Sequence, residues 1–123
     1  MLREDKKKLA LKLVSDTYNN ISDKNIYQTF DFAEFLKDND QLKESIKVYS
    51  EVIDKISKNH SLYPEATDGR GVAYERIGNW DKAEKDLLSS LEASPDQAYV
   101  INYLAYSWIE KGINIEQSLK MLE

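Results

Sequence analysis

The chain has 123 residues, of which only four are glycine and two are proline. So few turn-forming residues exclude β-sandwiches and β-barrels, whose many corners depend on them. The formal net charge of −5 makes nucleic acid an unexpected partner, because the chain would repel phosphate. Cysteine is absent, which excludes disulfides and cysteine-bound zinc. No apolar run is longer than that of residues 103–106, which is far shorter than the roughly 20 residues of a membrane span, so no span is expected.

Apolar residues recur at steps of three and four along most of the chain, which is the period of an amphipathic helix. In the segment 42–56, for example, Leu42, Ile46, Tyr49 and Ile53 fall on one helical face. The spacing predicts seven helices, which in chain order cover residues 3–21, 25–38, 42–59, 64–77, 80–93, 96–111 and 115–123.

Residues suited to helix ends mark the boundaries. Gly78 and Gly112 suit the left-handed residue that follows a helix. The segment 94–97 has a capping serine, a proline at the first helical position and a glutamine three residues after the cap, and Asn114 offers an amide cap. The acidic turn around Asp40 lacks the glycine and the glutamate of a calcium loop, so Asp40 is expected to cap the helix that follows.

The helices repeat along the chain. A shift of 34 residues places Ala105 on Gly71 and Trp108 on Tyr74, whereas going backward from this unit the shift is 38 because the loop near residues 60–63 is longer. Small residues let two helices approach closely, and large residues alternate with them to fill the gap. The alignment predicts the following packing positions: Ala33, Leu36, Gly71, Tyr74, Trp80, Ala83, Leu87, Pro95, Leu104, Ala105 and Trp108.

A helix–turn–helix period of 34 residues resembles the tetratricopeptide repeat (TPR). Residues 64–97 carry most of that pattern, with Gly71 and Ala83 in small slots and Tyr74 in an aromatic one, while Arg70 departs from it. The resemblance implies an all-α fold: a right-handed superhelical array (α-solenoid) of antiparallel helix pairs with about seven helices. A pentatricopeptide array has a similar period and binds RNA, but such arrays are usually basic.

The resemblance also divides the chain into units within a single domain. Residues 1–25 correspond to the second helix of an earlier unit, 26–63 and 64–97 to repeats, and 98–123 to a partial repeat. Because both ends fall inside a unit, the chain is expected to be a fragment of a longer array.

In TPR arrays the first helix of each unit lines a concave groove that takes an extended peptide or a partner helix. Carried over by alignment, the groove candidates are Tyr27, Phe30, Glu34, Glu65, Asp68, Val72, Glu75, Tyr99, Asn102 and Tyr106, with Lys37 and Ile109 beside them. This surface is aromatic at both ends and acidic in the middle, which favours a partner with Lys or Arg flanked by apolar residues. The resemblance therefore implies a protein–protein interaction scaffold.

Two alternatives remain open at this point. One is a structural module that forms homo-oligomers by stacking through the array ends or the convex face. The other, an enzyme or carrier, is not expected, because His60 is the only histidine and neither a nucleophile elbow nor a phosphate loop is present. No cofactor or metal is expected. The compartment is undetermined: cytoplasm, or a bacterial cell envelope if a lost segment carried a signal.

Overall fold

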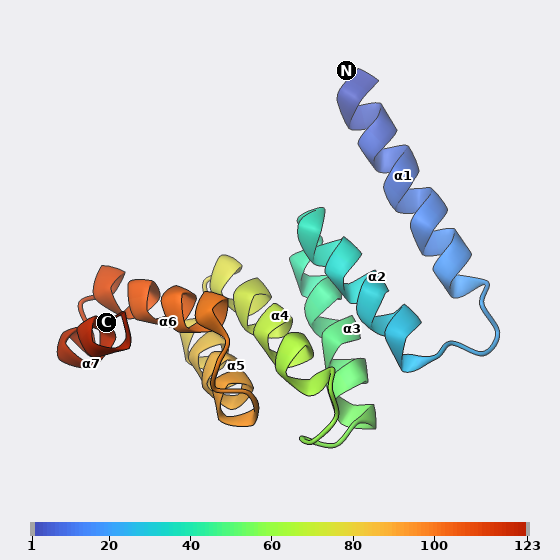
Figure 1. The fold of residues 1–123 in the computed structure, drawn as a ribbon. Coiled ribbons are helices and arrows are strands. Elements are labelled where there is room, and N and C mark those ends of the chain that lie inside the picture. Colours follow the sequence, from blue (N-terminus) through green and yellow to red (C-terminus); the bar gives the residue numbers. More distant parts are fainter. Residues whose placement is uncertain (1, 123) are drawn as a thin grey trace.

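The computed structural model describes residues 2–122, and every regular element in that range is a helix. In chain order the helices are α1 (Leu2–Asn19), α2 (Ile26–Asp38), α3 (Leu42–Lys55), α4 (Tyr63–Arg76), α5 (Trp80–Ala93), α6 (Ala98–Glu110) and α7 (Ile115–Met121). Consecutive helices pack as pairs, α2 with α3, α4 with α5 and α6 with α7, as Figure 1 shows. The predicted all-α, repeat-like fold is confirmed.

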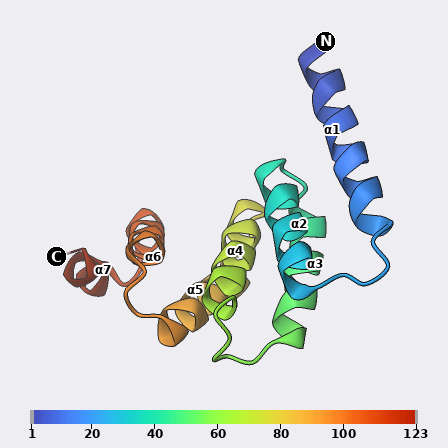
Figure 2. The same cartoon turned by 45° about the vertical axis from the view of Figure 1, so that its right-hand side comes forward.

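The pairs are not joined equally tightly. The pair α4–α5 has the most extensive contact, and α3 also packs against α4, so α2 to α5 form the body of the molecule. In contrast, α1 contacts α2 only sparsely and projects from that body in both ribbon views (Figures 1 and 2). Among the described residues no helix combines the length and the apolar character that a bilayer crossing requires.

The turns after α2, α4 and α6 have the same backbone geometry. Asp40, Gly78 and Gly112 adopt left-handed conformations with φ of 62°, 88° and 71°. In each turn the next backbone N–H donates to the carbonyl five residues earlier, at 2.8, 2.9 and 2.9 Å respectively. This is the Schellman pattern. Its recurrence at spacings of 38 and 34 residues agrees with the register that the sequence alignment predicts.

Three predicted helix ends are wrong in detail. Asp40 does not cap α3, because it is itself the left-handed residue and Gln41 takes the cap position without a side-chain bond. Asn114 precedes α7 in a left-handed conformation and makes no capping bond either. The helix α3 ends at Lys55 instead of residue 59, because Ile56 is extended.

The predicted capping of α6 by the serine and proline of residues 94–97 is also wrong, and the helix begins two residues after the predicted residue 96. The helix begins at Ala98, and Pro95 lies exposed in the preceding turn. The Gln97 side-chain amide donates to the carbonyls of Ser90 and Ser94 at 3.0 and 2.9 Å. These bonds hold the end of α5 and the turn together, so the serine–proline pair does not open a helix.

The other predicted packing positions form the interior. Eight of them are buried: Ala33, Leu36, Gly71, Ala83, Leu87, Leu104, Ala105 and Trp108. Tyr74 and Trp80 are half-buried. At Gly71 an added Cβ would lie 3.2 Å from the Ala83 carbonyl and from Leu87, which shows how closely α4 and α5 approach.

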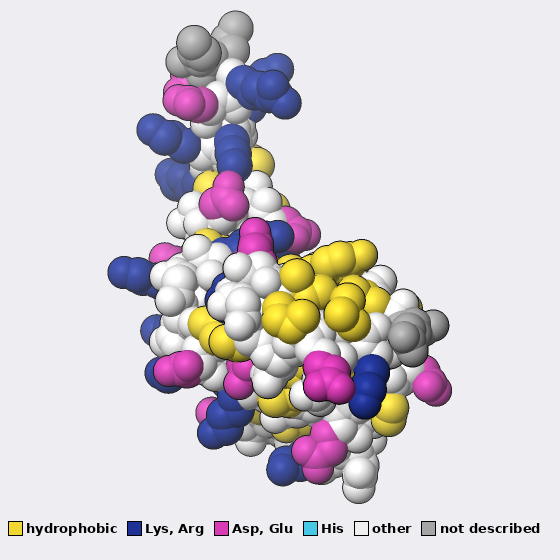
Figure 3. All heavy atoms as spheres, turned by 90° about the vertical axis from the view of Figure 1, so that its left-hand side faces the viewer, with side chains coloured by type: hydrophobic (Ala, Val, Ile, Leu, Met, Phe, Trp, Pro, Cys, Tyr) yellow, Lys and Arg dark blue, Asp and Glu magenta, His cyan; other side chains and the backbone are white. Residues whose placement is uncertain are grey.

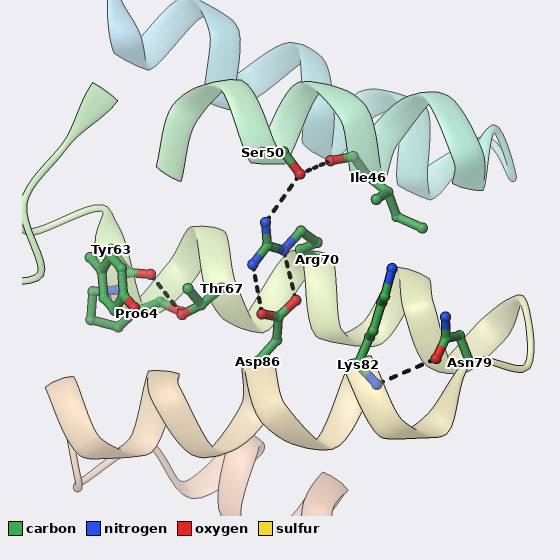
Figure 4. Close-up of polar contacts among 9 residues, drawn as sticks. All are labelled: Ile46, Ser50, Tyr63, Pro64, Thr67, Arg70, Asn79, Lys82 and Asp86. Carbon is green, nitrogen blue, oxygen red and sulfur yellow. Dashed lines mark hydrogen bonds and ion pairs between the residues drawn. The ribbon is translucent and has the colours of Figure 1, made fainter. Parts of the chain in front are cut away.

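An ion pair that the sequence analysis missed links three helices (Figure 4). Arg70 on α4 donates through Nε and Nη2 to both carboxylate oxygens of Asp86 on α5, at 2.7 and 2.8 Å. Its Nη1 donates to the Ser50 hydroxyl on α3 at 3.1 Å. Asp86 is 4% exposed, so its carboxylate is buried. Arg70 stands where the TPR pattern has a leucine, so the pair places a polar contact where that pattern has an apolar one.

Candidate functional site

The first helices of the three predicted units lie next to one another. Helices α2 and α4 are in contact, and the Tyr103 hydroxyl of α6 donates to Glu75 of α4 at 3.1 Å. We call the surface formed by the predicted groove residues on α2, α4 and α6 the first-helix face (Figure 1).

Most of the predicted residues do lie at the surface. Tyr27, Tyr99 and Tyr106 expose 54%, 61% and 61% of their area, and Glu65 and Asn102 are exposed as well. Three large aromatic side chains are therefore in contact with water, one on α2 and two on α6. Such residues dominate the energetics of many protein interfaces when they become buried.

The remaining predicted residues are less accessible. Phe30, Glu34, Asp68 and Glu75 are half-buried. Val72 is only 2% exposed, so its inclusion in the groove was wrong: its side chain belongs to the interior. The alignment could not show this. It predicts which side of a helix faces outward, but not how far the neighbouring helices cover that side.

The middle of the first-helix face carries an excess of negative charge. Lys37 forms an ion pair with Glu34 across 3.0 Å, one helical turn away on α2. On α4, one carboxylate oxygen of Asp68 is buried without a hydrogen-bond partner among the described residues. Burial raises the pKa of Asp68 to about 6; the Lys37 charge opposes this rise, while Glu34 and Glu65 add to it. A single lysine therefore stands among three carboxylates.

Tyr49 of α3 lies beneath this acidic region. Its side chain is fully buried, its ring lies edge-on to Phe30 with centroids 6.2 Å apart, and Lys37 Nζ stands 5.9 Å from its centroid. A Cβ at Gly69 would lie 2.6 Å from the Tyr49 hydroxyl, so only glycine leaves room for this ring against α4. Burial, then the neighbouring Glu34, raises the pKa of the phenol.

Sequence reasoning placed Tyr49 in the core but assigned no role to Gly69, which has no slot in the repeat pattern. The reason is that the contact depends on one large ring reaching one particular helix. A glycine inside a helix costs about 1 kcal/mol of stability relative to alanine. The presence of Gly69 within a predicted helix was therefore the available indication that another side chain approaches the backbone closely there.

The α6 end of the face is aromatic and partly fixed in place. Tyr103 is held by its bond to Glu75, and burial, then that carboxylate, raises its pKa. Tyr99 lies next to Tyr103, with ring centroids 6.0 Å apart, and Tyr106 is free of such ring contacts among the described aromatic pairs.

Two hollows lie beside the helices, and the first is close to the α2 end of the first-helix face, because the rings of His60 and Tyr27 have centroids 6.2 Å apart. One, of about 560 Å³, is polar and lies where the loop containing His60 meets the end of α5. The His60 Nδ1 accepts the Leu62 backbone N–H at 3.0 Å, which gives this residue a structural part in the loop. The other hollow, of about 390 Å³, lies between α1 and α2 and is lined mainly by apolar side chains, including Leu13 and Phe32.

No protein-family model matches the chain. No curated protein matches it either.

Proposed function

We propose that the chain is a TPR-like interaction module whose first-helix face binds an extended peptide or a partner helix. The observation that carries the proposal is the arrangement on that face. Three exposed tyrosines flank an acidic centre in which one carboxylate oxygen of Asp68 has no hydrogen-bond partner within the part of the chain that the structure describes. Exposed aromatic anchors around an unneutralised charge are features of interaction surfaces.

The charge balance supports a partner of defined chemistry. Glu34, Glu65 and Asp68 outnumber the single Lys37 at the centre of the face. Burial first, and then Glu34 and Glu65, raise the pKa of Asp68, and a Lys or Arg side chain entering there would favour its charged form, while apolar neighbours in the partner would cover Tyr27 and Tyr106. The partner is therefore a protein segment with a basic residue flanked by apolar ones.

Selection of a displayed peptide library against the immobilised chain tests this proposal. Selected peptides are synthesised and titrated calorimetrically against the wild type and a Tyr27→Ala/Tyr106→Ala variant. Both side chains are exposed, so the variant is expected to keep its fold, which circular dichroism checks. We expect binding to weaken at least tenfold, corresponding to about 1.4 kcal/mol. Leu88→Ala is the matched control, because this exposed residue lies on α5, outside the face.

The peptide side of the interface is tested separately. Replacement of the conserved basic position of the selected peptides by norleucine keeps the apolar stem and removes the charge. We expect the norleucine peptide to bind the wild type more weakly than the basic peptide does. In the Asp68→Asn variant the same replacement should cause a smaller loss of affinity. Selected peptides without a basic position, or with unchanged affinity for the double tyrosine variant, would contradict the proposal.

A further inference from the structure

Two buried polar atoms lie beneath the acidic centre of the first-helix face. Tyr49 is fully buried, and neither its hydroxyl nor Asp68 Oδ1 has a hydrogen-bond partner within residues 2–122. The carboxylates of Glu34 and Asp68 both lie near that hydroxyl. Because a buried polar atom without a hydrogen bond costs free energy, the two atoms together indicate a place that a hydrogen-bond donor would complete.

The Lys37 side chain lies at this place. It is 14% exposed, and its ammonium pairs with Glu34 at 3.0 Å and stands 5.9 Å from the Tyr49 ring centroid. Burial raises the pKa of Asp68, and the Lys37 charge opposes that rise. Asp68 nevertheless forms no ion pair of its own among the described residues. Lys37 therefore occupies a cation position whose acceptors it satisfies only in part.

Little holds Lys37 in this position. It is the last residue but one of α2, and its ion pair with Glu34 joins residues one helical turn apart, a kind of pair that contributes little to stability. The lysine stem is flexible, so the ammonium can turn into water without any change in the backbone. Lys37 is therefore a replaceable occupant.

We propose that Lys37 competes with the basic residue of the partner for one subsite, formed by Glu34, Asp68 and Tyr49. In the free chain the Lys37 ammonium occupies the subsite. In the complex the partner's cation takes its place and donates to Asp68 Oδ1 and to the Tyr49 oxygen, while Lys37 turns into solvent. This inference rests on the proposed function and adds the residue that limits affinity for the basic group.

The apolar neighbours of the partner's basic residue find a separate place on the molecule. Figure 3 shows apolar atoms gathered at the α6–α7 end, which carries the exposed Tyr99 and Tyr106. A change at Lys37 on α2 should therefore alter the recognition of charge and leave the apolar contacts on α6 as they are.

The occupied subsite is tested first without any peptide. Carbon-13 NMR of the Asp68 carboxyl follows its protonation between about pH 4 and pH 8 in the wild type, in Lys37→Met and in Lys85→Met. Methionine keeps an apolar stem and removes the charge, and Lys85 is an exposed residue of α5 outside the face. Lys37→Met should raise the Asp68 midpoint, because Glu34 and Glu65 then act unopposed, and Lys85→Met should not. An unchanged midpoint in Lys37→Met overturns the inference.

The exchange of cations is tested with a selected basic peptide at saturation. In the wild type one cation replaces another, so the Asp68 midpoint should change little, whereas in Lys37→Met the peptide supplies a missing charge and the midpoint should fall. The ε-methylene signals of wild-type Lys37 should move to those of the exposed Lys85. These wild-type measurements need no variant, so they decide the case even if Lys37→Met folds poorly, which circular dichroism checks.

Calorimetry gives the effect on affinity. Lys37→Met should bind the basic peptide at least tenfold more tightly than Lys85→Met, although the two variants have the same net charge. The peptide with norleucine at the basic position should bind both variants alike. Equal affinities of the two variants for the basic peptide overturn the inference.

Two further outcomes separate this inference from the proposed function. If the peptide lowers the Asp68 midpoint equally in the wild type and in Lys37→Met, and the Lys37 signals stay unchanged, then the partner's cation binds beside Lys37. That result overturns the competition and leaves the proposed function intact. A peptide whose affinity does not depend on Tyr27 and Tyr106 overturns the proposed function and this inference together.

Discussion

The ion pair between Arg70 and Asp86 makes a strong prediction about stability. The two side chains expose 21% and 6% of their area, and two hydrogen bonds of 2.7 and 2.8 Å join them. Arg70→Leu would leave the Asp86 carboxylate buried without its counter-charge. Removing one partner of a buried pair costs about 3–5 kcal/mol, and we expect about 3 kcal/mol because water can reach the partly exposed position of Arg70.

The double variant separates the charge effect from the loss of side-chain volume. In Arg70→Leu/Asp86→Ala no buried charge remains, and a leucine stands where the repeat pattern has one. We expect this variant to be more stable than Arg70→Leu alone by about 1–2 kcal/mol. The Asp86→Ala single variant leaves a partly hydrated guanidinium and should cost less than Arg70→Leu.

Urea denaturation followed by far-ultraviolet circular dichroism measures these free energies of unfolding. Glu51→Ala, exposed on α3, is the control and should stay within about 0.5 kcal/mol of the wild type. A double variant no more stable than Arg70→Leu would refute the reasoning, because the unpaired carboxylate would then not be the cause of the loss.

Three further predictions follow from the close contacts and the backbone. Gly69→Ala should destabilise the fold by about 1–3 kcal/mol despite its better helix propensity, since its Cβ would meet Tyr49 at 2.6 Å. Asp40→Gly should stabilise it by about 0.5–1 kcal/mol, since φ at this position is 62° and glycine adopts it without strain. Asp68→Asn should raise the free energy of unfolding at pH 7 by on the order of 1 kcal/mol, allowing for partial exposure of the carboxylate.

The pH dependence of that last effect has a definite sign. The Asp68 pKa is raised to about 6 in the folded state, while an unperturbed aspartate has a pKa near 4. Between these values the folded state retains the proton that the unfolded state has lost, so stability falls as pH rises from about 4 to about 6. The advantage of Asp68→Asn should therefore grow over that range and then level off, and an advantage independent of pH would contradict the assignment.

The Gly69→Ala and Asp40→Gly predictions each have a matched control. Gly71→Ala should cost less than Gly69→Ala, because its Cβ contacts begin at 3.2 Å. Gly78→Ala should lose stability where Asp40→Gly gains it, because φ of 88° strains alanine. Thermal and urea unfolding measure both pairs. An equal cost at the two glycines of α4 would show that the close approach of Gly69 to Tyr49 does not decide the effect. A destabilised Asp40→Gly variant would show that the left-handed φ at this position carries no strain.

The repeat spacing was sufficient to predict the helices and much of the core. Periodic apolar residues and the glycines at 78 and 112 depend on local geometry, which sequence encodes directly. The start of α6 was not predictable in this way, because the Gln97 side chain bonds back to α5 instead of serving a helix cap. The left-handed Asp40 was equally hidden, since aspartate is a common cap as well as a tolerated left-handed residue.

The candidate site was predictable only in outline. Alignment identified the helical faces that carry Tyr27, Tyr99 and Tyr106, and the structure places all three at the surface. The burial of Val72 and of the Asp68 oxygen that finds no hydrogen-bond partner in residues 2–122 depends on packing between helices distant in sequence, which residue spacing does not determine.

The most direct test of the proposed function is an amide chemical-shift titration of the isotopically labelled chain with a selected peptide. We expect the largest shifts to map to α2, α4 and α6, around Tyr27, Asp68 and Tyr106. Shifts confined to α3, α5 and α7, or to the hollow between α1 and α2, would contradict it.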